Sequence, residues 1–327
     1  MLLNLILDGN YILSKLVFTL HKNNLLYGAL DQALENTLSN YRKLYPFHTI
    51  YLVSDSKERS WRKELSKKYK SNRKKDNDID WDFVYNTYNE FKERRSFIKV
   101  LEYPRIEGDD WIALICEKTN SVGESNLIVT NDHDIKQLVR MDLEDEWINF
   151  ISNEMYNNKS VFMPMNYKMF LNKIGDKPND DIFNMNDNSE FLNLCETLTT
   201  SHKTTEIDWT ESLISKIISG DASDNIKSVY LGRTTTGKLR GIGVKGAKTI
   251  LNNYIKEFGP LDIDDPDLAE NIGDLICEKK KLGKDKIESI SNRVQENRKM
   301  VQLETEFFPT DIKKSLEEKW NEICGEL

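Results

Sequence analysis

This chain of 327 residues lacks the features that mark membrane and secreted proteins. It has no run of about 18 apolar residues, so we expect no transmembrane helix. The apolar N-terminus has no basic region before it and is interrupted by Asp8, which argues against a signal peptide. The four cysteines lie far apart and form no CxxC pair, which argues against disulfides and against a zinc site. We therefore expect a soluble protein with reduced thiols.

Positive charge is also in deficit, since 54 acids outnumber 46 Lys and Arg and the net charge is −8, but much of it is concentrated in two segments. Residues 57–75 contain ten Lys or Arg and two acids, and residues 225–256 contain seven Lys or Arg and no acid. Such segments on an acidic chain are typical of an enzyme that grips phosphates with one surface and holds metals with another. A lysine run can also be a solvated face, which is our interpretation of 278–286, where acids are interspersed.

Strand-like runs alternate with helical stretches in the first half of the chain. We expect strands over residues 4–7, 49–53, 97–101, 127–130 and 147–151, and helices over about 25–44 and from Asp110 onward. This rhythm predicts an α/β domain with a mostly parallel sheet in residues 1–152.

The remaining segments have different compositions. Residues 56–96 contain few aliphatic side chains, and we expect one or two exposed helices there, joined by a polar loop at 71–80. Residues 153–215 are rich in Asn, Thr and Ser, which indicates a peripheral or linking segment. Residues 216–327 are expected to form a helical C-terminal domain.

Acidic residues lie at or just after the ends of the expected strands. Each of the first four strands ends in an acid or shortly before one. Because the carboxyl ends of parallel strands meet at one sheet edge, acids far apart in the sequence would converge there. The candidate ligands are Asp8, Asp55, Glu107, Asp109, Asp110, Asp132, Asp134, Asp221 and Asp224. Oxygen ligands suit Mg²⁺ or Mn²⁺, and two such ions about 4 Å apart can promote phosphoryl displacement.

Two pairs among these acids have spacings that bring carboxylates together. Asp132 and Asp134 would share one side of an extended segment, with His133 pointing away from them. Asp221 and Asp224 would share one face of a helical turn. Each pair alone also fits ordinary turn and helix-start acids. Together with the acids at the strand ends, they favour a two-metal site.

The glycine-rich segment contains two partial motifs that we do not favour. Residues 241–246 match G-x-G-x-x-G but follow a polar basic loop, and residues 232–238 lack the Ser or Thr that completes a P-loop. A helix-hairpin-helix element near 239–255 fits better, because its backbone N–H groups would cradle a DNA phosphate. The candidate contacts are Gly241, Gly243, Lys245, Gly246 and Lys248.

Aromatic side chains interleave with cations in and after the basic segment 57–75. Aromatic rings stack on unpaired bases and cations hold phosphates, so single-stranded nucleic acid is one natural ligand. The same rings could instead pack the helices of this segment together. The candidate nucleic-acid contacts here are Arg59, Arg62, Lys63, Lys67, Tyr69 and Lys74.

Six motifs, in this order, resemble the flap endonuclease or 5′→3′ exonuclease family, and most of all its T-even phage ribonuclease H type. They are ILDGN at 6–10, LVSDSKERSWRKELSKKYKSNRKK at 52–75, IEGDDWIA at 106–113, IVTNDHDIKQL at 128–138, ISGDASDNI at 218–226 and GIGVKGAKTIL at 241–251. The resemblance implies a PIN-like nuclease domain, a helical arch within 56–96, and a helix-hairpin-helix element.

The resemblance also assigns roles to individual residues. It implies that Asp8, Asp55, Glu107 and Asp109 hold a first Mg²⁺ ion, that Asp132, Asp134 and Asp221 hold a second with Asp224 as a further candidate, and that Asp110 lies between the two. Lys70 and Arg73 match arch cations that contact the scissile phosphate. A K⁺ ion at the glycine hairpin is also implied. Residues 227–240 are a departure, because the family commonly has only a few residues there.

The activity implied is hydrolysis near the 5′ ends or flaps of RNA or DNA annealed to DNA, as in removal of RNA primers during replication. The setting implied is the cytoplasm of a phage-infected or bacterial cell, with a monomeric enzyme and a single-stranded-DNA-binding protein or sliding clamp as candidate partners. One alternative is a PIN-type endoribonuclease, which would need neither the basic arm nor the hairpin. The others are a non-catalytic binder of branched DNA, which would not need so many acids, and an ATPase using residues 232–238.

Overall fold

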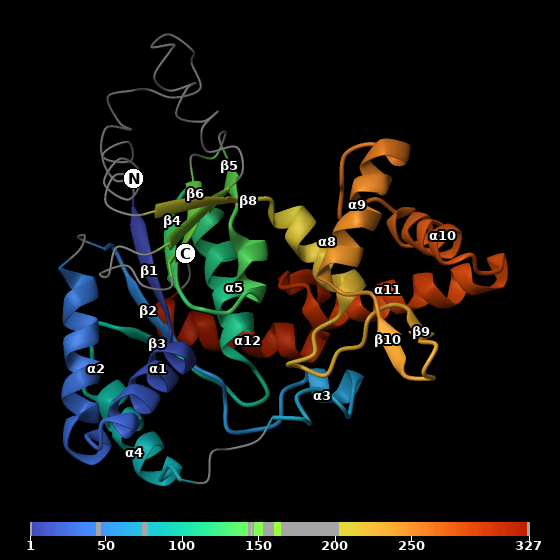
Figure 1. The fold of residues 1–327 in the computed structure, drawn as a ribbon. Helices are drawn as coiled ribbons and strands as arrows, with labels where there is room; N and C mark the ends of the chain where they lie inside the picture. The colour runs from blue at the N-terminus through green and yellow to red at the C-terminus, as the bar shows by residue number, and fades with distance from the viewer. Residues whose placement is uncertain are drawn as a thin grey trace. The chain divides into compact units, whose positions relative to one another are not determined.

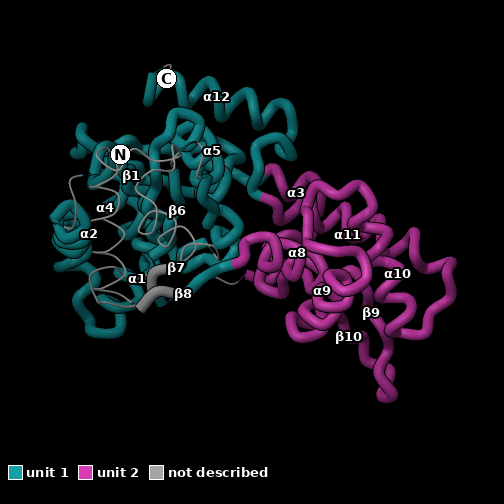
Figure 2. Tube along the Cα trace, turned by 90° about the horizontal axis from the view of Figure 1, so that it is seen from above, with its two compact units in different colours: residues 1–60, 75–207, 303–327 teal, residues 61–74, 208–302 magenta. Residues whose placement is uncertain are grey.

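The computed structural model divides the chain into two compact units, drawn in teal and magenta in Figure 2. Unit 1 comprises residues 1–60, 75–207 and 303–327, and unit 2 comprises residues 61–74 and 208–302. The structure describes residues 2–43, 47–73, 78–142, 145, 147–152, 160–164 and 203–325.

Unit 1 is built around a sheet with the strand order β3-β2-β1-β4-β6-β7-β8, with β5 paired to β6 (Figure 1). The strands are β1 (Leu3–Asp8), β2 (Ile50–Val53), β3 (Lys99–Leu101), β4 (Ser125–Val129), β5 (Met141–Asp142), β6 (Trp147–Ser152), β7 (Ser160–Pro164) and β8 (Lys203–Ile207). The five strands from β3 to β6 along the sheet are mutually parallel, whereas β7 runs antiparallel to β6. The expected mostly parallel sheet is thus confirmed.

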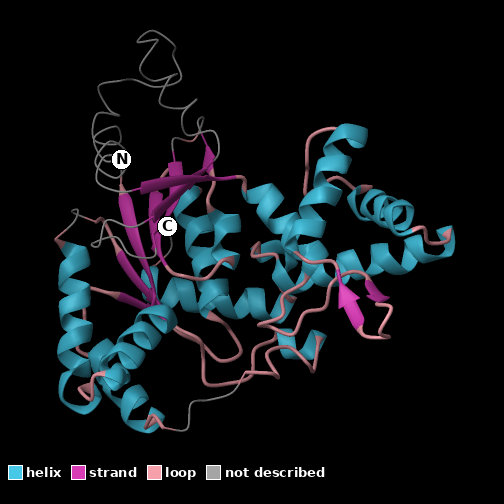
Figure 3. Ribbon diagram, viewed as in Figure 1, coloured by secondary structure: helices cyan, strands magenta, loops and turns pink. Residues whose placement is uncertain are grey.

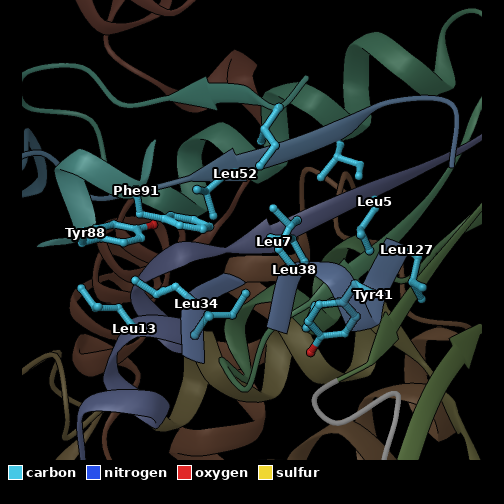
Figure 4. Close-up of a cluster of buried hydrophobic side chains, with 14 of the residues drawn as sticks. Leu5, Leu7, Leu13, Leu34, Leu38, Tyr41, Leu52, Tyr88, Phe91 and Leu127 are labelled. Carbon is cyan, nitrogen blue, oxygen red and sulfur yellow. The ribbon is translucent and has the colours of Figure 1, made fainter. Parts of the chain in front are cut away.

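Both faces of this sheet are covered, which explains why its central strands are almost wholly apolar. In β1, Leu5 and Leu7 point to one face, where they join a cluster with α1 (Gly9–Lys22), α2 (Leu26–Arg42) and α4 (Trp81–Glu93). Figure 4 shows this cluster, including Leu34 and Leu38 of α2. The buried residues of α2 recur every three or four positions, which is the spacing of one helix face.

The opposite face of the sheet is covered by α5 (Gly108–Asn120) and α12 (Thr310–Cys324) (Figure 3). Trp320 of α12 is buried and stacks on Tyr51 of β2, with ring centroids 5.8 Å apart. Residues 303–327 therefore belong to unit 1 and not to the helical region of unit 2. This differs from the expected C-terminal domain at 216–327, because the second sheet face needs a cover that α5 alone does not complete.

Unit 2 is mainly helical and has its own apolar core. Its elements are α3 (Arg62–Leu65), α8 (Trp209–Ser219), β9 (Leu231–Arg233), β10 (Leu239–Gly241), α9 (Val244–Phe258), α10 (Leu268–Lys280) and α11 (Ile287–Val301), with a short 3₁₀ turn η3 (Lys284–Lys286). Helices α8, α9, α10 and α11 contact one another through buried aliphatic side chains.

Two of the expected segments differ from the structure. Residues 56–96 were expected to be exposed, but α4 buries Val84, Tyr88 and Phe91 in the sheet cluster, since one face of this polar helix is apolar. The segment 153–215 was expected to be peripheral, but its described parts supply β7, β8 and the start of α8. Residues 153–159 and 165–202 lie outside the described part of the chain.

Two further expectations concern the membrane and the cysteines. Within the described residues, no helix combines the length and the apolar character needed to span a bilayer. Cys116, Cys277 and Cys324 are free thiols, and Cys195 lies outside the described residues.

Candidate metal centre and nucleic-acid interface

The register of the sheet brings distant acids to one edge of unit 1. Asp8 at the end of β1 is paired with Val53 at the end of β2, and Leu7 is paired with Val129 at the end of β4. Residues just after Val53 and Val129 therefore leave the sheet beside Asp8. They include Asp55 and, on the other side, Asp132.

Asp8 is buried and closely held. Its carboxylate accepts a 3.0 Å hydrogen bond from the Tyr11 backbone N–H, which caps α1, and a 2.6 Å hydrogen bond from the Thr130 hydroxyl. Burial raises the pKa of Asp8, these hydrogen bonds oppose the rise, and the charges of Asp55 and Asp132 reinforce it, so that the pKa reaches about 6. The charges of Asp55 and Asp132 thus both act on the carboxylate of Asp8.

Asp55 is exposed on the loop after β2. Its carboxylate accepts a 2.7 Å hydrogen bond from the Gly108 backbone N–H at the start of α5, and its own N–H approaches the Asn10 side-chain oxygen at 3.5 Å. A carboxylate at a helix N-terminus is stabilised by the helix dipole. Asp55 is therefore fixed between the end of β2 and the start of α5.

The acids of the IEGDD motif are arranged by the start of α5. Glu107 is its N-cap and accepts a 2.9 Å hydrogen bond from the Ser60 hydroxyl. Asp110 is fully buried and accepts a hydrogen bond from the Glu107 N–H, which completes a capping box. The helix thus begins at Gly108, before the expected start at Asp110, and Asp110 has a capping role. Asp109 lies in the first turn and is half-buried.

The expected geometry of Asp132 and Asp134 is wrong. His133 between them has helical φ and ψ angles of −72° and −17°, so this segment is not extended. The Asp132 carboxylate accepts a 2.8 Å hydrogen bond from the Asp134 N–H, and Asp134 begins the 3₁₀ turn η1 (Asp134–Leu138). Asp132 is exposed and Asp134 is half-buried, and both still lie beyond the end of β4.

These seven acids of unit 1 fit a divalent cation. They offer only carboxylate oxygens, which are the ligands that Mg²⁺ and Mn²⁺ prefer. Burial is the main cause of the raised pKa of Asp8, and the charges of two further carboxylates add to it, so a cation would relieve their repulsion. The members of this cluster, which we call the acidic edge, are Asp8, Asp55, Glu107, Asp109, Asp110, Asp132 and Asp134.

The other two predicted ligands lie in unit 2, in a tight turn that follows α8 and not in a helical turn. Burial alone would raise the pKa of Asp221, but the Lys216 ammonium and two hydrogen bonds from Ser223 outweigh it and hold the pKa at about 2. The Asp224 carboxylate is paired with the Arg73 guanidinium at 2.5 Å. Both acids thus already have cationic neighbours within unit 2.

The segment 61–73 packs within unit 2 instead of standing free. The Lys70 N–H donates to the Asp224 carbonyl at 2.9 Å, and the Asn72 amide donates to the Ala222 carbonyl at 2.9 Å. The Tyr69 ring is buried in the core of unit 2. These contacts place Lys70 and Arg73 against the turn that carries Asp224.

Two of the predicted nucleic-acid contacts are buried, and the prediction for them is wrong. Arg62 is 2% exposed, donates from Nε to the Met300 carbonyl at 3.1 Å, and lies over the Trp61 ring. Tyr69 is 4% exposed. Arg62 and Tyr69 therefore pack the unit and present no surface to a base or a phosphate. Arg59 and Lys67 are exposed and Lys63 is half-buried, whereas Lys74 lies outside the described residues.

The glycine segment is preceded by a short β-hairpin that was not expected. Residues 232–238, the partial P-loop, span β9 and the turn to β10, where the Thr234 N–H donates to the Lys238 carbonyl at 2.8 Å. A P-loop leads from a strand into a helix, so the ATPase interpretation is wrong. Gly243 is the N-cap of α9, and no side chain caps that helix. Lys245 is exposed, and Lys248 is paired with Glu211 at 3.1 Å.

Thr130 is the main site residue that the sequence did not single out. Besides donating to Asp8, its hydroxyl accepts a 3.0 Å hydrogen bond from the Asp132 N–H. Asn10 and Ser60 also contact acids of the edge. Thr130 and Asn10 are short polar residues inside motifs that carry an acid, and Ser60 lies in the motif of Asp55. That position is the one signal that could have identified them.

This chain is similar in sequence to known 5′-3′ exonucleases. A 5′-3′ exonuclease of Mycoplasmopsis pulmonis is 25% identical over 260 residues, which cover 76% of this chain and 66% of that protein. A 5′-3′ exonuclease of Buchnera aphidicola subsp. Acyrthosiphon pisum is 29% identical over 157 residues, which cover 46% of this chain and 52% of that protein. The chain thus spans less than two thirds of each of these relatives.

Solved structures have the same fold. The bacteriophage T5 D15 protein co-crystallised with metal ions superposes with a TM-score of 0.59 at 17% identity, covering 98% of this chain and 99% of that one. A variant of the T5 D15 flap endonuclease, in a complex with DNA and metal ions, superposes with the same TM-score and identity over 99% of this chain and 100% of that one.

The family defined by the N-terminal, resolvase-like domain of 5′-3′ exonucleases matches residues 3–174, which is more than half of the chain and includes the whole acidic edge. This chain belongs to the 5′-3′ exonuclease family.

Proposed function

We propose that the protein is a metal-dependent, structure-selective 5′→3′ exonuclease and flap endonuclease that hydrolyses RNA or DNA annealed to DNA. The observation that carries the proposal is the acidic edge, where Asp55 and Asp132 converge on the buried carboxylate of Asp8. A carboxyl whose pKa is raised first by burial and then by neighbouring carboxylates, as that of Asp8 is, is typical of a functional site and not of a solvated surface.

The acidic edge would hold two divalent cations. Asp8, Asp55, Glu107 and Asp109 form the half beside β1, β2 and α5, and Asp132 and Asp134 form the half beyond β4. When bound, such ions activate a water and neutralise charge on the phosphate and the leaving oxygen. The chain itself orients the ligands, since Thr130, Tyr11 and Gly108 donate hydrogen bonds that leave Asp8 and Asp55 little freedom. For Lys70, Arg73, Asp221 and Asp224, the roles implied by the family resemblance stay predictions.

The substrate polarity and the choice of RNA or DNA rest on the family. The T5 flap endonuclease with the same fold has been crystallised with DNA and metal ions, which supports a DNA-containing substrate for this chain. Removal of RNA primers, and therefore ribonuclease H activity, is our proposal for its task. The nuclease chemistry would reside in residues 1–152 and duplex binding in the helix-hairpin-helix region near 239–255, where a K⁺ ion is a candidate ligand.

The test is cleavage of 5′-labelled flap, nicked and RNA–DNA duplex substrates with and without Mg²⁺. We expect short 5′ products only with the metal, and loss of cleavage in Asp132→Asn with flap-DNA binding retained. Asp82→Asn is the matched control, because it removes the same charge from an exposed position on α4. Full activity of Asp132→Asn would contradict the metal assignment, and cleavage of unstructured RNA without preference for a 5′ end would favour an endoribonuclease.

A further inference from the structure

We propose that Tyr88 of α4 is a positioning residue for the metal ligands: its buried hydroxyl lies between the ends of β1 and β2 and sets the distance between Asp8 and Asp55. The proposal rests on the proposed function, because it assigns a role in holding the ligands of that enzyme's cations. Tyr88 lies in none of the six motifs that carry the family resemblance, so the role follows from the structure alone.

The Tyr88 hydroxyl contacts the first residue beyond each of these strands. It forms a 3.0 Å hydrogen bond with the Ser54 hydroxyl, and both side chains are buried. At Gly9, an added Cβ would lie 2.0 Å from the Tyr88 hydroxyl oxygen, so the hydroxyl can approach because no side chain stands there. Gly9 directly follows Asp8, and Ser54 directly precedes Asp55. A shift of this hydroxyl therefore moves the backbone beside two acids of the edge.

The sheet does not itself fix the distance between these two acids. The register between β1 and β2 ends at the pair Asp8–Val53. Beyond that pair, β1 continues into α1, whereas the Ser54 N–H donates a 3.1 Å hydrogen bond to the Leu101 carbonyl at the end of β3. The backbone of Ser54 is thus tied to β3, and the Tyr88 hydroxyl links this residue to the end of β1.

The ring that carries this hydroxyl is itself firmly held. In the cluster of Figure 4, the Tyr88 ring stacks on Phe91, with ring centroids 6.4 Å apart. The Lys92 ammonium lies 4.8 Å from the centroid of the Tyr88 ring and pairs with Glu102, which follows β3, at 2.5 Å. Packing therefore fixes the position of the hydroxyl, and α4 braces the ends of three neighbouring strands.

The hydroxyl suits a site of carboxylates because it is neutral. Burial raises the pKa of the Tyr88 hydroxyl, the hydrogen bond with Ser54 opposes the rise, and the charge of Asp8 adds to it. The group stays protonated and does not compete with a cation for the carboxylates. Two divalent cations need their ligands at a defined separation, and a displacement of about 1 Å can cost about 100-fold in rate.

The test compares variants of the two hydroxyl groups with the unaltered protein. Tyr88→Phe removes the hydroxyl and keeps the ring, Ser54→Ala removes its partner, and the double variant removes both. The matched control is Tyr41→Phe, which removes the hydroxyl of another buried tyrosine of the same cluster, on α2. The measurements are Mn²⁺ binding by isothermal titration calorimetry, the cleavage rate of a 5′-flap substrate against Mg²⁺ concentration, flap-DNA affinity, and urea unfolding in EDTA.

We expect Tyr88→Phe to weaken Mn²⁺ binding, and to raise the Mg²⁺ concentration for half-maximal rate, by about tenfold each, as loss of a group behind a metal ligand does. Flap-DNA affinity should not change, because the hydroxyl is buried. Ser54→Ala should act in the same direction, and the double variant should bind Mn²⁺ no more weakly than Tyr88→Phe, since the two hydroxyls act as one unit. The control should bind Mn²⁺ like the unaltered protein, even if it is less stable to urea.

Normal Mn²⁺ affinity and Mg²⁺ dependence in Tyr88→Phe and Ser54→Ala would overturn the proposal, whatever the stability of these variants. So would an equal loss of Mn²⁺ affinity in Tyr41→Phe, because that would indicate a general loosening of the cluster. If Tyr88→Phe does not fold, Ser54→Ala decides alone, since it removes the same hydrogen bond.

The unaltered protein separates this proposal from the proposed function. If it binds Mn²⁺ and cleaves 5′-labelled substrates but the variants bind the ion normally, the role assigned to Tyr88 is wrong and the proposed function stands. If it binds Mn²⁺ without cleaving any of these substrates, and Tyr88→Phe weakens that binding, the enzyme assignment is wrong and the positioning role stands.

Discussion

The Thr130 hydroxyl donates a 2.6 Å hydrogen bond to the carboxylate of Asp8 and accepts a 3.0 Å hydrogen bond from the backbone N–H of Asp132. One buried side chain thus positions two acids of the edge, one at the end of β1 and one beyond β4. Hydrogen bonds of this kind fix the direction of a metal ligand and tune its basicity.

Thr130→Val should lower Mg²⁺-dependent cleavage by about 10–100-fold and raise the Mg²⁺ concentration for half-maximal rate, because valine keeps the shape but removes both hydrogen bonds. Thr130→Ser, which retains the hydroxyl, should stay within about threefold of the unaltered protein. The measurement is the cleavage rate of a 5′-flap substrate against Mg²⁺ concentration. Equal rates for the valine and serine variants would show that the hydroxyl has no positioning role.

Asp8→Asn should stabilise the metal-free protein above pH 6. The pKa of Asp8 is raised from 3.8 to about 6, so the folded state binds the proton more tightly than the unfolded state. Its contribution to stability is full below pH 3.8 and is lost as the pH rises through about 6. The ionised carboxylate then costs about 3 kcal/mol, which asparagine avoids while it still pairs with Tyr11 and Thr130.

Urea unfolding in EDTA measures this effect. At about pH 8 the variant should be more stable, and at about pH 4 the two proteins should differ little. Added Mg²⁺ should stabilise the unaltered protein more than Asp8→Asn, since the variant lacks a ligand. A variant that is less stable than the unaltered protein at the higher pH without metal would contradict the assigned burial cost.

The acids at the strand ends could be predicted because Asp8, Asp55 and Asp132 each follow an apolar run, and a parallel sheet gathers the ends of such runs at one edge. The role of Thr130 could not, because it depends on which strand lies beside β1 and in what register. That register is set by contacts between residues more than 100 positions apart.

Burial of charged and terminal residues also could not be predicted from local patterns. Arg62 stands in a basic run that suggests exposure to solvent, but it meets the end of α11, which lies far along the chain. In α12, the spacing of Ile312, Leu316 and Trp320 shows that one helix face is apolar. The spacing does not show that this face covers the sheet of unit 1, since an apolar helix face can pack against any apolar surface.

Gly9→Ala should destabilise the protein by several kcal/mol and reduce activity. An added Cβ would lie 2.0 Å from the Tyr88 hydroxyl and 2.6 Å from the Val53 carbonyl oxygen, so the chain beside Asp8 would have to shift. A shift there would move a strand end that carries the acidic edge. Thermal unfolding and the cleavage rate measure the two consequences.

Gly28→Ala is the control for this substitution, because no atom lies within 4 Å of its added Cβ and the position is inside α2. It should stabilise the protein by about 0.5–1 kcal/mol through helix propensity, with activity unchanged. If the Gly9→Ala protein were as stable as the Gly28→Ala protein, that result would contradict the close packing of β1, β2 and α4 beside Asp8.

Arg62→Ala should lower stability, whereas Arg59→Ala should lower only affinity for nucleic acid. The Arg62 guanidinium donates to the Met300 carbonyl in the last turn of α11, and it lies 4.4 Å from the centroid of the Trp61 ring. Its loss leaves a buried helix-end carbonyl without this donor and opens space beside Trp61, a cost of about 2–4 kcal/mol.

Arg59 is exposed on the loop after β2, so its removal should leave the urea midpoint unchanged. Flap-DNA affinity, measured with each folded variant below its urea transition, should fall for Arg59→Ala and stay near the unaltered value for Arg62→Ala. If Arg62→Ala instead lowered flap-DNA affinity and left stability unchanged, Arg62 would be a nucleic-acid contact. A side chain that binds phosphate has to leave its contact with α11, so that contact would then contribute little to stability.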